Sequence, residues 1–140
     1  MDAMCAKMLD PEFNKGIEVI VLPNLYGDIV TDVAAEHQGG LGTASSSNIG
    51  NKYAMFEAIH GTAPFLMSHG RGNYADPCSL IRAAGMLMAH IGYGDRKEIL
   101  DKALDICTIT EKKLVVTTDV DGATAAEFTD YLIDTINRMK

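Results

Sequence analysis

Two aspartates, Asp28 and Asp32, stand four residues apart in a stretch whose apolar residues have helical spacing. On a helix this spacing puts both carboxylates on one face, one turn apart. Hard divalent cations such as Mg²⁺ and Mn²⁺ are held by a few carboxylates together with water and substrate oxygens. The pair therefore predicts a metal site. Spacing alone leaves an alternative open, in which acids near a helix amino terminus only complement the helix dipole.

The elements that would position this pair are a strand followed by a helix. Residues 17–22 form a β-branched run of strand length, and Pro23 ends it. The apolar spacing from Asp28 to His37 predicts a helix, which Gly39 and Gly40 would end. Because α/β sheets usually bind ligands at the carboxyl ends of their strands, we expect the aspartate pair at such an end.

The rest of the chain is predicted to alternate strands and helices joined by Gly-rich loops, which indicates the α/β fold class. The tail of a helix is expected at residues 3–9, before Asp10 and Pro11. A loop is expected at residues 39–50 and a short strand at residues 53–59. An irregular stretch should follow, through Asn73.

Three helices are predicted to complete the chain, and each has a start signal. Asp76 and Pro77 precede an apolar stripe that ends at Gly92. The other two helices begin with pairs that match the capping box, in which each side chain satisfies the backbone amide of the other residue. These pairs are Asp95 with Glu98 and Thr124 with Glu127, and their helices should run to about residues 112 and 138. The stripe consists of Leu80, Ile81, Ala84, Leu87, Met88 and Ile91.

Four ordered motifs surround the aspartate pair and continue beyond it. They are Pro23-Asn24-Leu25-Tyr26-Gly27-Asp28-Ile29-Val30-Thr31-Asp32, Gly39-Gly40-Leu41-Gly42, Ser47-Asn48-Ile49-Gly50 and Phe56-Glu57-Ala58-Ile59-His60-Gly61-Thr62-Ala63-Pro64. Together they resemble the signature of the isocitrate and isopropylmalate dehydrogenase family. The likeness covers essentially all 140 residues. It implies the carboxyl-terminal part of that α/β fold, with strands and flanking helices.

The resemblance assigns the metal site to particular residues. In the family, the aspartates that match Asp28 and Asp32 ligate a divalent cation, Mg or Mn. A third aspartate comes from the partner protomer, and Asp2 is the candidate for it in this chain. A ligand shared in this way implies a dimer.

The resemblance also implies a site for a nicotinamide cofactor. The turn from His60 to Pro64 would hold the adenosine half, with Glu57 toward the nicotinamide end. Asp76 stands where family members carry an Asn that meets the adenine, and Asp119 matches an Asp beside the adenine pocket. Two alternatives stay open, a structural hydrogen-bonding role for His60 and ordinary turn chemistry for Asp119. The implied cofactor-binding residues are Glu57, His60, Gly61, Thr62, Ala63, Asp76 and Asp119.

Cofactor choice can be argued from the side chains expected at the 2′ position of the adenosine ribose. A 2′-phosphate needs cationic or hydroxyl partners, whereas a 2′-hydroxyl prefers an acceptor. NADP-dependent relatives place Lys-Tyr where this chain has Phe65 and Leu66, and a Tyr and an Arg where it has Thr118 and no Arg. NAD is therefore favoured over NADP, and Phe65 also stands where NAD-specific relatives often carry Asp.

Composition excludes several classes of partner. The net charge is -7, and the basic residues are scattered along the chain, so nucleic acid is not an expected partner. No apolar run approaches the roughly 18 residues needed to span a bilayer, so no membrane association is expected. Cys5, Cys78 and Cys107 stand far apart and outside ligand spacing, which favours reduced, buried thiols and a cytoplasmic location.

The reaction that the resemblance implies is the oxidative decarboxylation of isocitrate to 2-oxoglutarate with reduction of NAD. Three substrate carboxylates need several converging cations. No arginine lies near the aspartate pair in sequence, and solvated surface roles are expected for all of them. We therefore expect residues 1–140 to be a single partial domain that carries the metal and cofactor motifs and is inactive alone, because the amino-terminal substrate-binding half is absent. The arginines are Arg71, Arg82, Arg96 and Arg138.

Other functions stay open at this point. The chain could belong to an isopropylmalate-type dehydrogenase, although Asn48-Ile49-Gly50 favours isocitrate. It could also be a non-catalytic module that binds nucleotide or associates with another subunit. The expected partners are isocitrate or a related 2-hydroxy acid, together with either a second copy in a homo-oligomer or the missing half.

Overall fold

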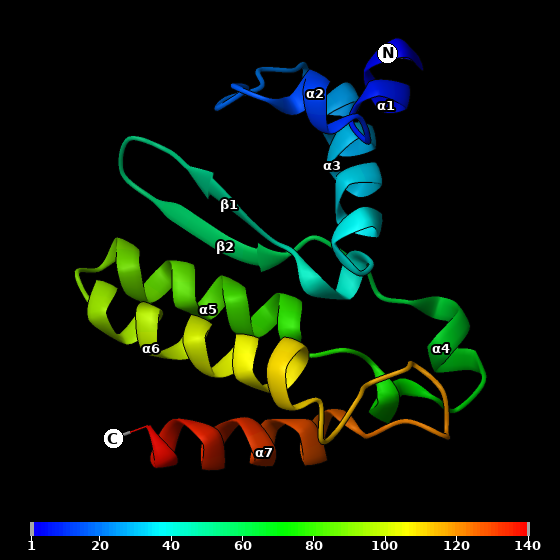
Figure 1. Ribbon diagram of the computed structural model, residues 1–140, viewed down its shortest axis with the longest axis vertical. Helices are drawn as coiled ribbons and strands as arrows, with labels where there is room; N and C mark the ends of the chain where they lie inside the picture. Colours follow the sequence, from blue (N-terminus) through cyan, green and yellow to red (C-terminus); the bar gives the residue numbers. More distant parts are fainter. Residues whose placement is uncertain (1, 140) are drawn as a thin grey trace. The chain divides into compact units, whose positions relative to one another are not determined.

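The computed structural model describes residues 2–139, which divide into two compact units, residues 2–41 and residues 42–139 (Figure 1). Helices make up the first unit, whereas a two-stranded sheet and helices make up the second. The described chain thus mixes helices and strands, as the α/β class requires.

The first unit is built from helices joined by irregular segments. Asp10 begins the second of them because its carboxylate accepts hydrogen bonds from the amides of Glu12 and Phe13, at 3.0 and 3.4 Å. The predicted helix over Asp28–His37 is confirmed, although it begins earlier, at Asn24. It ends where Gly39 takes a φ of 131°, which few residues besides glycine adopt. The helices are α1 (Asp2–Lys7), α2 (Pro11–Asn14) and α3 (Asn24–Gln38), and the 3₁₀ turn η1 (Leu41–Thr43) follows where the chain passes into the second unit.

The strand predicted at residues 17–22 is wrong. These residues belong to no strand, and the amide of Ile17 only closes the turn after α2 by donating to the carbonyl of Asn14. Val19 and Val21 expose 79% and 88% of their surface. A β-branched run becomes a strand only when a neighbouring strand supplies hydrogen-bond partners, and the described residues 2–41 contain none.

A β-hairpin opens the second unit. β1 (Ser45–Ile49) pairs antiparallel with β2 (Ala54–Ala58), so that Ser45 faces Ala58 and Ile49 faces Ala54. β2 confirms the strand predicted over residues 53–59, whereas the loop predicted over residues 39–50 is wrong at β1. The Ser-rich sequence of β1 lacks the apolar alternation by which strands are recognised.

The helices of the second unit begin close to their predicted starts. Asp76 accepts a hydrogen bond from the amide of Cys78 at 2.9 Å, and Thr124 with Glu127 forms the predicted capping box. The cap predicted at Asp95 is wrong, because the helix already begins at Gly94 and places Asp95 inside its first turn. The stretch predicted as irregular contains a short helix. The elements are α4 (Pro64–Ser68), η2 (Gly72–Tyr74, 3₁₀), α5 (Cys78–His90), α6 (Gly94–Asp105), η3 (Ile106–Glu111, π-helical) and α7 (Ala125–Arg138).

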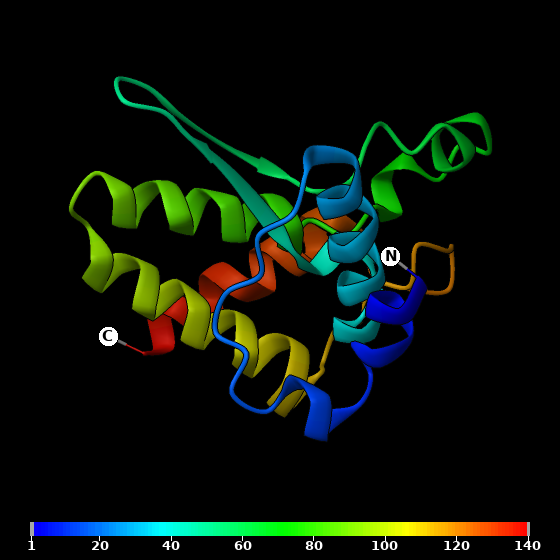
Figure 2. The ribbon, with the colours of Figure 1, turned by 90° about the horizontal axis from the view of Figure 1, so that it is seen from above.

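The core of the second unit lies between α5, α6, η3 and α7. α5 contacts both the hairpin and α6, and α6 also contacts α7 (Figure 1, Figure 2). Cys78 and Cys107 are buried and unpaired in this core, as the sequence predicted, and burial raises the pKa of the Cys78 thiol. The core consists of Cys78, Ala103, Leu104, Cys107, Phe128 and Leu132.

The apolar stripe predicted on α5 is not the face that this chain buries. Leu80 and Ile91 expose 62% and 58% of their surface, whereas the small residues Ser79 and Ala83 are buried. Small side chains let α6 approach closely: a Cβ added at Gly85 would already lie 3.4 Å from the side chain of Leu100. The periodicity correctly indicated an amphipathic helix, but not which side its neighbours within the described chain would cover.

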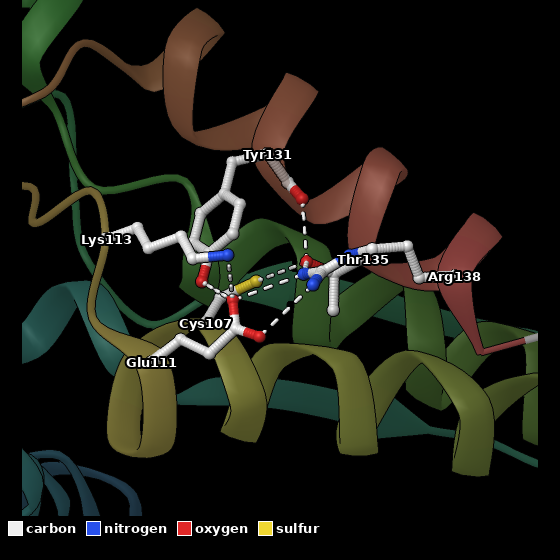
Figure 3. Close-up of polar contacts among 6 residues, drawn as sticks. All are labelled: Cys107, Glu111, Lys113, Tyr131, Thr135 and Arg138. Carbon is white, nitrogen blue, oxygen red and sulfur yellow. Dashed lines mark hydrogen bonds and ion pairs between the residues drawn. The ribbon is translucent and has the colours of Figure 1, made fainter.

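A charged hub fixes α7 to η3 (Figure 3). The carboxylate of Glu111 accepts hydrogen bonds from Tyr131 at 2.7 Å and from both terminal nitrogens of Arg138 at 3.2 Å, and Lys113 lies 2.9 Å away. Arg138 also donates to the buried Thr135 at 2.9 Å. Arg138, Tyr131 and Lys113 lower the pKa of Glu111 to about 2. One carboxylate therefore holds the last helix through both a planar guanidinium and a phenol.

Removal of the Thr124 cap tests the start of α7. Thr124→Ala leaves the amide of Glu127 without its side-chain acceptor, and should lower the free energy of unfolding by roughly 1 kcal/mol in urea titrations. Thr129→Ala is the matched control, because the Thr129 hydroxyl only donates to the carbonyl of Ala125 within α7. Equal destabilisation by the two substitutions would contradict the assigned cap.

Acid unfolding tests the hub. The folded pKa of Glu111 lies below its ordinary value of 4.5, so its stabilising contribution is present above about pH 4.5 and is lost as the pH falls toward about 2. Glu111→Gln should lower stability at pH 7 and flatten the decline of stability below pH 4.5, as followed by circular dichroism during urea unfolding. Glu98→Gln, on an exposed part of α6, should leave that decline unchanged.

Candidate functional site

The predicted metal ligands Asp28 and Asp32 both lie on α3 with exposed side chains. They follow one another by one helical turn, so their carboxylates project from the same face, as predicted. Neither carboxylate takes part in an ion pair within residues 2–139. The pair therefore presents uncompensated negative charge on one face of the helix.

The expected position of the pair needs one correction. α3 begins at Asn24, so Asp28 lies in the second turn, and the first turn contains no acidic residue. No strand precedes the helix within the described residues, and the pair is therefore not at the carboxyl end of a strand. Because the helix dipole acts mainly within the first turn, complementing it explains these aspartates poorly.

Asp2 lies at the start of α1, in the same unit as the pair. Its carboxylate accepts a hydrogen bond from the amide of Ala3 at 2.7 Å. Among residues 2–139, no group of three histidine, cysteine, aspartate or glutamate side chains is arranged to hold a metal ion. Asp28 and Asp32 thus offer two ligands, and Asp2 of the same chain does not complete a set of three.

The predicted cofactor turn follows β2 and is open. His60, Gly61 and Thr62 are exposed, and a Cβ placed on Gly61 would meet nothing within 4 Å. The ring nitrogen Nδ1 of His60 lies 3.0 Å from the carbonyl oxygen of Gly61. Ala63 adopts a left-handed φ of 47° before Pro64 opens α4. The turn therefore offers exposed backbone to a ligand at the start of a short helix.

Ser79 holds this turn to α5, and the sequence analysis did not single it out. It is fully buried, and its hydroxyl accepts a hydrogen bond from the amide of Ile59 at 3.3 Å while donating to the carbonyl of Ala44. One side chain thus ties the ends of both strands to a helix. A serine in the first turn of a predicted helix was the available signal.

Two further predicted residues have defined contacts. Glu57 accepts a hydrogen bond from the side-chain amide of Asn48 across the hairpin, at 2.8 Å. Asp76 lies one residue before Pro77, the N-cap of α5, so the predicted cap is wrong by one residue, although its carboxylate accepts from the amide of Cys78. Asp76 also packs closely on Gly42, where an added Cβ would lie 2.8 Å from the Cβ of Asp76. Both carboxylates are thus positioned by a residue from one of the motifs named above.

Asp119 lies in the turn that precedes α7. Its carboxylate accepts a hydrogen bond from the amide of Val120 at 2.7 Å and forms an ion pair with Arg71 at 2.8 Å. The Val120 amide and, after it, the Arg71 guanidinium lower the pKa of Asp119. This carboxylate is therefore ionised and fixed in orientation at neutral pH.

The expectation of solvated surface arginines is wrong for two of the four. The Arg71 side chain is only 21% exposed, and the Arg82 side chain is 26% exposed, lying 3.7 Å from Asp105. Arg71 lies between α4 and η2, and its partner Asp119 is far away in the sequence. Local spacing cannot reveal an ion pair of this kind.

Comparisons with known proteins identify the family of this chain. A family model described as "Isocitrate/isopropylmalate dehydrogenase" matches residues 1–136. A mitochondrial regulatory subunit of NAD isocitrate dehydrogenase from Dictyostelium discoideum is 42% identical over 139 residues, which cover 97% of this chain and 37% of that protein. An NADP isocitrate dehydrogenase from Rickettsia typhi is 50% identical over 86 residues, which cover 61% of this chain and 17% of that protein.

The fold agrees as well. The crystal structure of isocitrate dehydrogenase from Methylococcus capsulatus matches with a TM-score of 0.85 and 30% sequence identity, over 96% of this chain and 39% of that one. This match confirms the α/β class. Within residues 2–139, no helix is long and apolar enough to cross a bilayer. This chain spans well under half the length of these relatives, and it belongs to the isocitrate/isopropylmalate dehydrogenase family.

Proposed function

We propose that this chain supplies the metal and cofactor residues of an isocitrate dehydrogenase, which converts isocitrate to 2-oxoglutarate with reduction of NAD. The observation that carries the proposal is the exposed pair Asp28 and Asp32, one turn apart on α3, in a chain that the isocitrate/isopropylmalate dehydrogenase family model matches over residues 1–136. The names of the relatives favour isocitrate over isopropylmalate.

The donor set fits a divalent cation. Asp28 and Asp32 offer hard carboxylate oxygens, which Mg²⁺ and Mn²⁺ prefer, and both side chains are free of competing cations within residues 2–139. When bound, the cation supplies Lewis-acid polarisation of a substrate oxygen. Asp2 of a second copy is the proposed third ligand, which makes a dimer the proposed assembly.

The proposed nucleotide site centres on the turn from His60 to Ala63. The exposed backbone of this turn can approach the adenosine half of the cofactor, and Asp76 and Asp119 supply carboxylates in the same unit. Glu57, fixed by Asn48, is proposed to lie toward the nicotinamide end. Asp119 as an ionised acceptor supports NAD rather than NADP.

The substrate carboxylates must be bound by another polypeptide segment. Every arginine of the chain already faces a carboxylate, so none is available to clamp a tricarboxylate without losing its partner. We therefore propose that an amino-terminal substrate-binding half completes the site and that the chain is inactive alone. The pairs are Arg71 with Asp119, Arg82 with Asp105, Arg96 with Asp95, and Arg138 with Glu111.

A second candidate function is a regulatory or subunit-interaction module. The similarity to a protein named as a regulatory subunit, with 42% identity over 97% of this chain, favours this candidate. Both candidates use the nucleotide site, and they differ in whether the metal pair takes part in turnover.

Metal binding separates the aspartate pair from ordinary surface acids. Mn²⁺ should broaden the NMR signals of α3 residues in the wild-type chain, and the double variant Asp28→Asn, Asp32→Asn should weaken this binding by roughly tenfold or more. Asp130 and Asp134 have the same spacing on exposed positions of α7, so Asp130→Asn with Asp134→Asn is the matched control. Equal loss in both double variants would refute a specific metal site.

Turnover separates the two candidate functions. The chain alone should not oxidise isocitrate with Mn²⁺ and NAD, as followed by the absorbance of NADH, because the clamping cations are missing. Addition of a separately produced amino-terminal half of an isocitrate dehydrogenase should restore activity, and Asp32→Asn should abolish the restored activity. NAD binding without turnover in any such mixture would instead favour the regulatory module.

A further inference from the structure

An ion pair joins two distant stretches of the second unit. Arg71 follows α4, and Asp119 lies in the turn before α7; their side chains meet at 2.8 Å between Nη1 and Oδ2. In Figure 1 the corresponding green and orange segments lie side by side. Both stretches adjoin residues proposed above to hold the adenosine half of the cofactor. The ion pair therefore joins two stretches that the proposed nucleotide site already includes.

Arg71 is held on a second side by an aromatic ring. Its guanidinium carbon lies 5.3 Å from the centre of the Phe65 ring, and the His69 ring packs on Phe65 at 4.2 Å between centroids. A guanidinium over a ring face is attracted by the ring quadrupole. We call Phe65, His69, Arg71 and Asp119 the Arg71 cluster. Because Phe65 follows the His60–Pro64 turn directly, the cluster continues the proposed nucleotide site.

The charges of the Arg71 cluster would act differently on a ribose 2′-hydroxyl and on a 2′-phosphate. Asp119 is an ionised acceptor with 54% of its side chain exposed, so it can accept hydrogen bonds from a ribose hydroxyl. A 2′-phosphate would be repelled by the same carboxylate. Arg71 could attract that phosphate only by leaving Asp119, because its charge is already matched and its side chain is 21% exposed.

We propose that Arg71 and Asp119 together determine cofactor choice, with Arg71 as a positioning residue that presents Asp119 to the 2′-hydroxyl of NAD. The pair also keeps Arg71 away from the 2′-phosphate of NADP. This inference rests on the proposed nucleotide site. It assigns a role to Arg71, a cation that is distant from Asp119 in sequence. It also implies that the chain would bind NADP better if Asp119 lost its charge.

Binding of two cofactor fragments tests the proposal. ADP-ribose and 2′-phospho-ADP-ribose are titrated calorimetrically into the 140-residue chain. Wild type should prefer ADP-ribose. Asp119→Asn should shift the ratio of affinities toward the 2′-phosphate form by roughly tenfold, because the freed guanidinium gains a charge-assisted partner. Arg71→Met should weaken ADP-ribose binding by a few fold without any gain for the phosphate form.

The double variant tests whether Arg71 is responsible for the gain in affinity for the 2′-phosphate form. Arg71→Met added to Asp119→Asn should abolish the gain in affinity for 2′-phospho-ADP-ribose. If that gain persists, or if Asp119→Asn does not change the ratio of affinities, the proposed role of the pair is overturned while the proposed nucleotide site still stands. Absence of binding of either fragment to wild type overturns the proposed nucleotide site and this inference with it. Asp95→Asn, which disrupts the exposed pair with Arg96, is the matched control and should leave the ratio unchanged. Thermal unfolding of each variant confirms that it is folded.

Discussion

The negative charge of Asp28 and Asp32 on one face of α3 is the constraint on which the proposed function depends. In the second unit, acidic side chains such as Glu111, Asp105 and Asp119 face arginines. On α3, Asp28 and Asp32 carry like charges one turn apart and face no cation within residues 2–139. Such a pair repels on a helix, and a bound cation would relieve that repulsion. Asp130 and Asp134 on α7 have the same spacing and also face no cation within residues 2–139, so the metal proposal rests on the motif around Asp28 and Asp32 and not on their charge alone.

Interactions at both ends of residues 112–124 hold the segment that carries Asp119. The Glu111 hub holds one end of this segment against α7, and the Thr124 capping box holds the other. Between them the amide of Ala123 donates to the carbonyl of Val115 at 2.9 Å, and a Cβ at Gly122 would lie 2.3 Å from the Thr117 hydroxyl. A side chain at position 122 would collide with Thr117, so the turn requires glycine there. Within this turn the Asp119 carboxylate is oriented by the amide of Val120 and by Arg71.

Sequence alone predicted what is determined locally. The capping box of Thr124, the end of α3 at Gly39, and the aspartate spacing all depend on neighbours within a turn or two, and the structure agrees with them. The strand at residues 17–22 failed because pairing depends on a distant partner, and β1 was missed because its polar side chains carry no alternation. The buried face of α5 and the Arg71 contact failed for the same reason: each is decided by residues far away in sequence.

The two candidate sites are built independently, each by the local structure of its own unit. The metal pair needs only α3, whereas the nucleotide site needs the hairpin, α4, α5 and the turn before α7 to be folded together. The proposed nucleotide site therefore lies entirely within the second unit, and binding of a nucleotide there would require neither metal nor substrate. Dehydrogenation requires more, because hydride transfer demands substrate, cofactor and cation in one geometry. The two proposed functions thus differ in whether the metal pair is used, and not in the proposed nucleotide site.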